Sequence, residues 1–328
     1  MVEFPDLRIL VAERSSFSEK GLQALEALAP TTALDLSQSE LAKAICDYQV
    51  LFVRLGLRVD GEVIQAAPNL RAIATPTTGL DHIDLETTAQ RNITVLSLKG
   101  ERAFLETVFS TAEHTFALLL ALVRRIPQAV QAVEHYEWRR DLFRGKELNG
   151  KILGILGYGR LGSMVARYGY AFGMHILAYD PYAAHFADFV QPCQSLAELL
   201  SQADILSLHV DLRPETTALI DQRAIDQMKK GAILVNTSRG AVVDEQALLK
   251  ALESGRLAGA ALDVLANEAA IRPGTPHPLI EYARTHNNLI ITPHIGGASQ
   301  EAIEKADLFL IEKTRRFFHN LQKTKPTA

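Results

Sequence analysis

Two hydrophobic patterns alternate along most of this 328-residue chain. Short apolar runs, such as LRILVA at 7–12 and YQVLFVR at 48–54, are typical of strands buried on both faces of a sheet. Longer stretches between them, such as residues 18–29, repeat apolar residues at helical spacing. Strands that alternate with helices form parallel βαβ units, so this pattern predicts an α/β protein built on doubly wound parallel sheets.

The alternation runs through two series, which predicts two domains. The first series ends near residue 102, and a helical pattern with Pro127 as its expected kink or break follows over 110–135. The second series begins at residue 151. An amphipathic helix over 299–318 is the last predicted element. We expect this last helix to return to the first domain. The predicted domains are therefore 1–102 with 299–328, and an inserted domain at 103–298.

Composition and charge exclude several classes of function. The net charge is −4 and no basic block stands out, which does not favour a nucleic-acid-binding protein. The longest strongly apolar run, residues 116–123, is stopped by Arg124 and is too short to span a membrane. Cys46 and Cys193 are the only cysteines, and no Cys/His spacing predicts a metal site. Few thiols and no basic, apolar leader at the start predict a cytoplasmic protein.

A glycine-rich loop follows the first strand of the second series. The sequence ILGILGYGRLG at 152–162 places Gly157, Gly159 and Gly162 in the GxGxxG spacing, between a strand and a helix. The first glycine permits a tight turn, the second lets the backbone approach a pyrophosphate, and the third lets the helix pack close to the sheet. Glycines at this spacing also occur in plain turns, so the loop needs further support.

Asp180 supplies that support, because it closes the next strand, HILAYD. An acid at this offset from the loop can accept the hydroxyls of an adenosine ribose. It repels a 2′-phosphate, which favours NAD over NADP. The alternative is that Asp180 is an ordinary turn residue before Pro181. The loop and the acid together favour NAD as cofactor.

Three ionisable groups follow three later strands of the same series. Arg239 follows AILVNTS, Glu268 follows the strand that ends at Asp263, and His294 follows LIITP. Parallel strands place these ends on one edge of the sheet, where ligands bind. The alternatives are a surface arginine paired with Asp244 or Glu245, solvated acids, and a structural histidine.

If these groups meet, they form a site suited to hydride transfer. His294 would be the acid/base on the substrate oxygen, and Glu268 would orient its imidazole and favour the protonated form. Arg239 would bind the substrate carboxylate with its planar guanidinium.

The chain resembles the D-isomer-specific 2-hydroxyacid dehydrogenases, and it is phosphoglycerate dehydrogenase-like. The resemblance is carried by GILGYGRLG, YDPY, LVNTSRGAVVDEQALLKALESGRLAGAALDV and ITPHIGGAS. It implies a Rossmann NAD-binding domain inserted into a flavodoxin-like substrate domain, and commonly a homodimer. It also implies an NAD-dependent oxidoreductase acting on a D-2-hydroxyacid or 2-ketoacid, with Arg239, Glu268 and His294 as catalytic residues.

The resemblance also implies further contacts. Those to the cofactor involve Arg160, Leu161, Asp180, His209, Thr216, Thr237 and Asp263. Gly296 and Gly297 would let the backbone pass close to the nicotinamide. The segment TTGLDHID is similar to a loop whose N–H groups hold the substrate carboxylate, which places Thr78 and Gly79 at the substrate.

Two departures concern the substrate. Arg54 matches an arginine that phosphoglycerate dehydrogenases use near the substrate phosphate, but a usual second arginine before TTGLD is absent. The segment after residue 98 is unusually charged and contains Arg102, a possible replacement cation or a mere loop variation. A second hypothesis is a non-enzymatic NAD-sensing binding or corepressor protein on the same fold. The intact Arg239, Glu268 and His294 favour the enzyme.

Overall fold

The chain divides into two compact units in a computed structural model that describes residues 2–323. Unit 1 is drawn from residues 1–107 and 298–328, and unit 2 is residues 108–297. The sequence placed these boundaries near 102 and 299. The difference at the first boundary arises because residues 102–105 form a short helix, whose Leu105 packs against Leu98 and Ala306 of unit 1.

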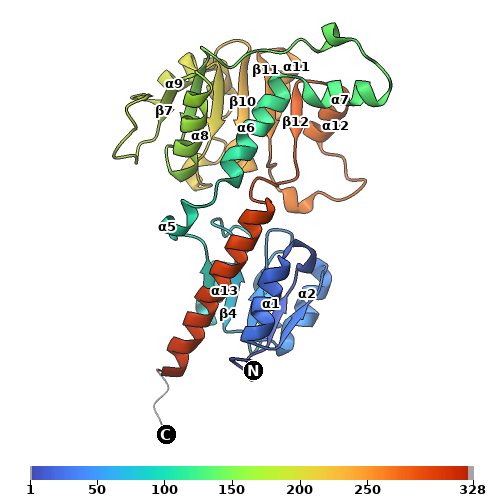
Figure 1. Cartoon of the computed structure of the whole chain (residues 1–328), viewed down its shortest axis with the longest axis vertical. Helices are drawn as coiled ribbons and strands as arrows, with labels where there is room; N and C mark the ends of the chain where they lie inside the picture. Colours follow the sequence, from blue (N-terminus) through green and yellow to red (C-terminus); the bar gives the residue numbers. More distant parts are fainter. Residues whose placement is uncertain (1, 324–328) are drawn as a thin grey trace. The chain divides into compact units, whose positions relative to one another are not determined.

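Unit 1 contains a five-stranded parallel sheet (Figure 1). Its strands are β1 (Ile9–Val11), β2 (Thr31–Ala33), β3 (Val50–Phe52), β4 (Ala72–Thr75) and β5 (Thr94–Ser97). Its helices are α1 (Glu19–Leu28), α2 (Gln38–Ala44), α3 (Gly61–Gln65), α4 (Leu85–Gln90), α5 (Arg102–Leu105) and α13 (Gln300–Lys323). The strand order β2-β1-β3-β4-β5 is that of the flavodoxin-like fold.

Helices cover both faces of this sheet. One core layer joins α1 and α13 to the strands through residues such as Leu25, Leu310 and Phe318. The other layer packs α2 and α3 on the opposite face through Leu41 and Ile64. The strands are consequently buried on both sides, which explains why they are apolar at successive positions. The last helix, α13, packs against α1 of the same unit.

Unit 2 contains a seven-stranded parallel sheet. Its strands are β6 (Ile152–Leu156), β7 (His175–Tyr179), β8 (Val190–Pro192), β9 (Ile205–Leu208), β10 (Ala232–Asn236), β11 (Leu257–Leu262) and β12 (Leu289–Ile291). Its helices are α6 (Ser110–Val123), α7 (Ile126–Glu134), α8 (Arg160–Ala171), α9 (Leu196–Gln202), α10 (Gln222–Gln227), α11 (Glu245–Glu253) and α12 (Pro278–Thr285).

The strand order of unit 2 is β12-β11-β10-β9-β6-β7-β8. The order reverses between β6 and β9, as in the Rossmann fold, and ligands bind at such a reversal. Helices α6 and α8 lie side by side on one face, and α9 to α12 cover the other (Figure 1). Two doubly wound parallel sheets confirm the predicted α/β fold class.

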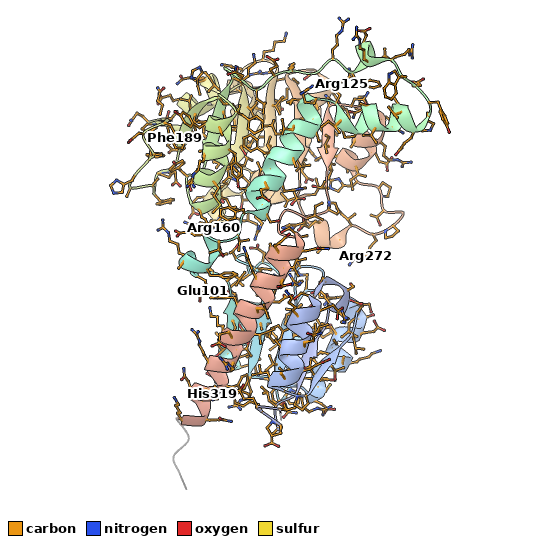
Figure 2. All side chains as sticks on the ribbon, viewed as in Figure 1. Glu101, Arg125, Arg160, Phe189, Arg272 and His319 are labelled. Carbon is orange, nitrogen blue, oxygen red and sulfur yellow. The ribbon has the colours of Figure 1, made fainter. Side chains whose placement is uncertain are left out.

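The predicted long helix over 110–135 is broken where the sequence expected a break. Helix α6 ends at Val123, and α7 begins at Ile126 with Pro127 in its first turn. Arg125, labelled in Figure 2, has a left-handed backbone with φ of 55°, which ends the helical run just before the proline.

Among the described residues no single helix is long and apolar enough to cross a membrane. The segments Arg102–Val123 and Ile126–Glu134 together pass such a test by length and composition, with a bend of 64° between them. The apolar side chains of α6, such as Leu119, are buried against the sheet of unit 2.

Candidate active site

The glycine loop lies at the reversal of the unit 2 sheet. Gly157 has φ of 89°, and a Cβ there would lie 2.8 Å from the carbonyl carbon of His209. A Cβ on Gly162 would overlap the carbonyl oxygen of Gly157, so this glycine lets α8 approach the loop. Gly159 is different, because nothing lies within 4 Å of its Cβ position. That open side leaves room for a ligand against the backbone.

Helix α8 starts directly from this loop. Gly159 is its N-cap and provides no side-chain hydrogen bond to the first turn. The N–H groups of the first turn therefore have no side-chain cap, and the helix dipole adds partial positive charge at the same place. The side chain of Arg160, labelled in Figure 2, turns toward the start of α6 and donates to the Val108 carbonyl at 2.9 Å. These residues fit the pyrophosphate of a dinucleotide.

Asp180 lies at the end of β7, beside the glycine loop. Its carboxylate accepts hydrogen bonds from the backbone N–H groups of Tyr158 and Tyr182, each at 2.8 Å. The first bond fixes the acid to the middle of the loop. The position fits the ribose end of an adenine nucleotide, whose hydroxyls can donate to the remaining lone pairs of the carboxylate.

Other residues assigned to the cofactor occupy strand ends of the same sheet. His209 follows β9, and its Nε2 lies 2.8 Å from the Ser207 hydroxyl. Burial lowers the pKa of His209 to about 3, so the ring is neutral. The Thr216 hydroxyl donates to the Asp211 carbonyl at 2.6 Å, and the buried Thr237 hydroxyl lies 2.8 Å from that of Thr115.

His294 and Glu268 form a hydrogen-bonded pair. The Nδ1 atom of His294 contacts the Oε1 atom of Glu268. The two side chains keep 23% and 38% of their surface exposed, so the pair is shielded but still open to a small molecule. His294 follows β12 and Glu268 lies beyond β11, its neighbour in the sheet. With Nδ1 engaged, Nε2 is the nitrogen left to meet a ligand.

Arg239 follows β10, the next strand in the same sheet. Its Nη1 donates to the Ser238 carbonyl at 2.8 Å, and its side chain is half-buried. The following Gly240 is packed so closely that a Cβ there would overlap the backbone of Leu265 and Ala266. The loop after β10 is thereby pressed against the segment that leads to Glu268.

Asp263 holds the loop that contains His294, residues 292–297, in place. It is 1% exposed, and its carboxylate accepts from the N–H groups of Ile295 at 2.9 Å and Gly296 at 2.7 Å. Its backbone carbonyl accepts from the N–H of His294 at 2.8 Å. Gly296 matters here because a Cβ would approach the Asp263 carboxylate at 2.9 Å, whereas the Cβ position of Gly297 is open.

Two residues beside Asp263 were missed by the sequence analysis. His114 of α6 places Nε2 3.2 Å from the Asp263 carboxylate and 3.0 Å from the Thr292 hydroxyl. That hydroxyl donates to Asp263 at 2.6 Å. Thr292 stands in the motif next to Pro293 and could have been suspected from it. No local pattern links His114 to a residue so far along the chain.

The residues assigned to the substrate in unit 1 follow β3 and β4. Thr78 and Gly79 lie in the loop after β4, where the Thr77 hydroxyl donates to the Gly79 carbonyl at 2.7 Å. Arg54 follows β3, and its guanidinium donates to the carboxylate of Asp307. The structure thus gives Arg54 a partner within unit 1.

The chain is similar to known proteins over most of its length. Residues 116–296 match the family model of the D-isomer specific 2-hydroxyacid dehydrogenase, NAD binding domain. A D-3-phosphoglycerate dehydrogenase of Mycobacterium bovis is 39% identical over 280 residues, which are 85% of this chain and 51% of the relative. A D-3-phosphoglycerate dehydrogenase of Methanocaldococcus jannaschii is 37% identical over 314 residues, 94% of this chain and 57% of the relative. The chain thus spans little more than half the length of these relatives.

Solved structures with similar folds cover nearly the whole chain. The D-lactate dehydrogenase of Aquifex aeolicus, in complex with NAD and lactic acid, is 29% identical with a TM-score of 0.78, and 97% of each chain is covered. The pyruvate reductase of Chlamydomonas reinhardtii is 26% identical with a TM-score of 0.81, covering 97% of this chain and 98% of that one.

Proposed function

Since the chain belongs to the D-isomer-specific 2-hydroxyacid dehydrogenase family, we propose that it is an oxidoreductase that uses NAD. The proposed reaction interconverts a D-2-hydroxyacid and its 2-ketoacid by transfer of a hydride and a proton. One observation carries the proposal: His294 and Glu268 are hydrogen-bonded at the same sheet edge that bears the glycine loop.

The proton is assigned to His294. Glu268 occupies Nδ1, which leaves Nε2 to exchange a proton with the substrate oxygen. In the reductive direction the protonated imidazole donates to the carbonyl oxygen of the ketoacid. In the oxidative direction the neutral imidazole accepts the hydroxyl proton. Glu268 holds the ring in one orientation in both directions.

NAD, when bound, supplies the position that accepts or donates the hydride. Its pyrophosphate is assigned to the loop of Gly157, Gly159 and Gly162 with the adjoining N–H groups of Arg160 and Leu161. Asp180 is assigned to the ribose. The remaining contacts to the cofactor are assigned to His209, Thr216, Thr237, Asp263, Gly296 and Gly297.

The substrate carboxylate is assigned to Arg239. Its guanidinium can bind a carboxylate through two parallel hydrogen bonds, which orients the adjacent carbon. The backbone N–H groups of Thr78 and Gly79 in unit 1 are proposed as further substrate contacts. The role of unit 1 as a substrate domain belongs to this proposal.

We also propose a homodimer located in the cytoplasm. Both cysteines, Cys46 and Cys193, are free thiols, which suits a reducing compartment. Apolar side chains are exposed on one face of α7, with Ile126 at 46%, Val130 at 52% and Val133 at 50%. An exposed apolar face of this kind marks a protein-binding surface. A second copy of the chain is its proposed partner.

The test is oxidation of NADH against a panel of 2-ketoacids. We expect turnover of at least one member, and His294→Gln should lower kcat roughly 10²–10⁴-fold because proton transfer is lost. The affinity for NADH, measured by fluorescence titration, should stay nearly unchanged. His286→Gln is the control, since that side chain lies outside the site.

Two outcomes would count against the enzyme. Tight binding of NADH without turnover of any ketoacid would favour an NAD-sensing protein. Normal turnover in His294→Gln would remove this histidine from the mechanism and leave the cofactor assignment standing.

A further inference from the structure

The sheet of unit 1, like that of unit 2, has a point at which the strand order changes sides. In the order β2-β1-β3, the strand that follows β1 in the chain lies on one side of it and the next strand lies on its other side, while all three run parallel. Ligands of open parallel sheets bind outside the carboxyl ends of strands at such a point. Glu13 follows β1 there, and Arg54 follows β3. The charges of these residues therefore bear on what the unit can bind.

Arg54 is held by two carboxylates. Its Nη2 donates to Asp307, a fully buried residue of α13, and its backbone N–H donates to Glu13. Asp307 also accepts from the Ser18 N–H at 2.8 Å, and Glu13 from the Gly56 N–H at 3.0 Å. Both acids are thus fixed by the backbone in positions that keep them next to the arginine.

The guanidinium is also packed from the side. Its central carbon lies 5.7 Å from the centre of the Phe17 ring, and only 17% of the Arg54 side chain is exposed. Its buried Nε has no hydrogen-bond partner among the described residues. The arginine is therefore used to tie the end of β3 to α13, and little of it faces outward.

The charge of this cluster is not positive. The cluster contains one guanidinium and two carboxylates, so it is negative when both acids are ionised and neutral when one is protonated. Burial raises the pKa of both Glu13 and Asp307, which favours the neutral state of the cluster over the doubly ionised one. A phosphate ester needs a cation that is free to pair with it.

The second cation suggested by the sequence, Arg102, is not held in a fixed position. The Nε of Arg102 lies 3.4 Å from Glu106, one turn along the chain, and its side chain is 88% exposed. An exposed ion pair of this kind contributes little to stability, so it does not hold the guanidinium in place for a phosphate.

We propose that the substrate of this chain is an unphosphorylated 2-hydroxyacid, because Arg54 is committed to Asp307 and acts as a positioning residue. This inference rests on the proposed function and narrows it. It also separates the chain from the D-3-phosphoglycerate dehydrogenases to which it is similar, whose names specify a phosphorylated substrate.

The test compares 3-hydroxypyruvate with its 3-phosphate ester, which differ only in the phosphate. With NADH in excess, we expect kcat/KM of the wild type to be at least about tenfold higher for the unphosphorylated acid, since a phosphate dianion finds no unpaired guanidinium at this cluster. Other unphosphorylated 2-ketoacids complete the panel, because the pocket can prefer a different side chain.

Asp307→Asn tests the cause. The amide keeps the shape of the side chain and removes the charge that neutralises Arg54, so the kcat/KM ratio of ester to acid should rise about tenfold. Glu304→Gln is the matched control: it lies on the same helix, loses an ion pair of 2.8 Å with Lys20, and changes the net charge equally. Glu13→Gln is the second variant if Asp307→Asn does not fold.

The outcomes separate the two claims. A wild type that prefers the ester overturns this inference and leaves the proposed function standing. An unchanged ratio in both Asp307→Asn and Glu13→Gln overturns the role given to Arg54. No oxidation of NADH with any ketoacid removes the proposed function, and this inference with it.

Discussion

The backbone of His294 adopts a conformation that is unusual for a residue other than glycine. Its φ is 55°, in the left-handed region, and Asn267 before Glu268 has φ of 53°. Such positions cost of order 1–3 kcal/mol and persist only where the surroundings enforce them. The bonds from Ile295 and Gly296 to the buried Asp263 carboxylate provide that enforcement. Asp263 therefore sets where the imidazole of His294 stands.

Asp180 carries the clearest prediction about cofactor choice. In Asp180→Asn the amide oxygen can still accept from the Tyr158 N–H, so the loop is kept while the negative charge is removed. The preference for NADH over NADPH, as a ratio of kcat/KM, should fall at least about tenfold because a 2′-phosphate is no longer repelled. Asp188→Asn is the control, with the same charge change at an exposed position. An unchanged preference would contradict the ribose assignment.

His209 makes stability depend on pH. Burial lowers its pKa from 6.5 to about 3, so the folded chain keeps the ring neutral while the unfolded chain takes up a proton below about pH 6.5. The unfolded state then binds more protons. The contribution of His209 to the free energy of unfolding is therefore full above that pH and is lost as pH falls toward the folded value.

The measurement is the melting temperature between about pH 7.5 and about pH 5, the range in which an ordinary histidine titrates. His209→Asn should flatten the fall seen in the wild type, because an amide takes up no proton. His185→Asn, at an exposed site, should keep the wild-type slope. Equal slopes in all three proteins would mean that His209 is not the buried neutral histidine described above.

At the scale of the elements, Gly240 joins two of the strand-end loops. A Cβ at this position would overlap the backbone of Leu265 and Ala266, so Gly240→Ala must separate the Arg239 loop from the segment before Glu268. Forcing extra volume into such a contact costs about 1–3 kcal/mol, or roughly 2–12 °C in melting temperature for a unit of this size. We expect kcat to fall as well.

A second glycine serves as the control that separates the steric effect of Gly240→Ala from the effect of any glycine-to-alanine substitution. At Gly61 an added Cβ would meet its nearest neighbour, Asp84, at an ordinary 3.6 Å. Gly61→Ala should therefore leave both the melting temperature and kcat near the wild-type values. A Gly240→Ala protein with normal kcat would show that the two loops act independently.

The sequence predicted the elements that carry long apolar runs and missed those that do not. Strands β2 (Thr31–Ala33) and β8 (Val190–Pro192) lie at sheet edges, pair on one side only and keep polar or exposed residues. Such strands lack the continuous apolar signal of a central strand. The short helices α3 and α4 were also missed. Their N-cap residues, Asp60 and Asp84, are a sequence signal from which the start of each helix could have been predicted.

Within the site, the sequence could predict only the placement of residues that directly follow parallel strands. Glu268 and His294 follow neighbouring parallel strands, and the topology alone brings them to one edge. The anchoring of their loops could not be predicted in the same way. His114 meets Asp263 across 149 residues, and Arg54 meets Asp307 across 253, through packing that leaves no local spacing in the sequence.

At the scale of the whole molecule, an apolar surface on unit 2 remains to be explained. Beyond the α7 face, Tyr136 is 98% exposed and Trp138 is 86% exposed. Side chains as large as these rarely stay in water together unless a partner covers them. A hollow lined by Leu122, Arg125 and Arg144 adjoins this segment and adds concave surface to it.

The double variant Val130→Asp with Trp138→Asp tests whether a second copy covers this surface. Burial of a large apolar side chain contributes about 1.5–3 kcal/mol, so losing two should weaken the dimer Kd by at least about 100-fold. Light scattering after gel filtration should then give a monomer mass where the wild type gives twice that mass. Leu85→Asp, an exposed leucine on α4 of unit 1, should remain dimeric. A wild type that is monomeric at micromolar concentration, or a double variant that stays dimeric, would assign these side chains to another partner.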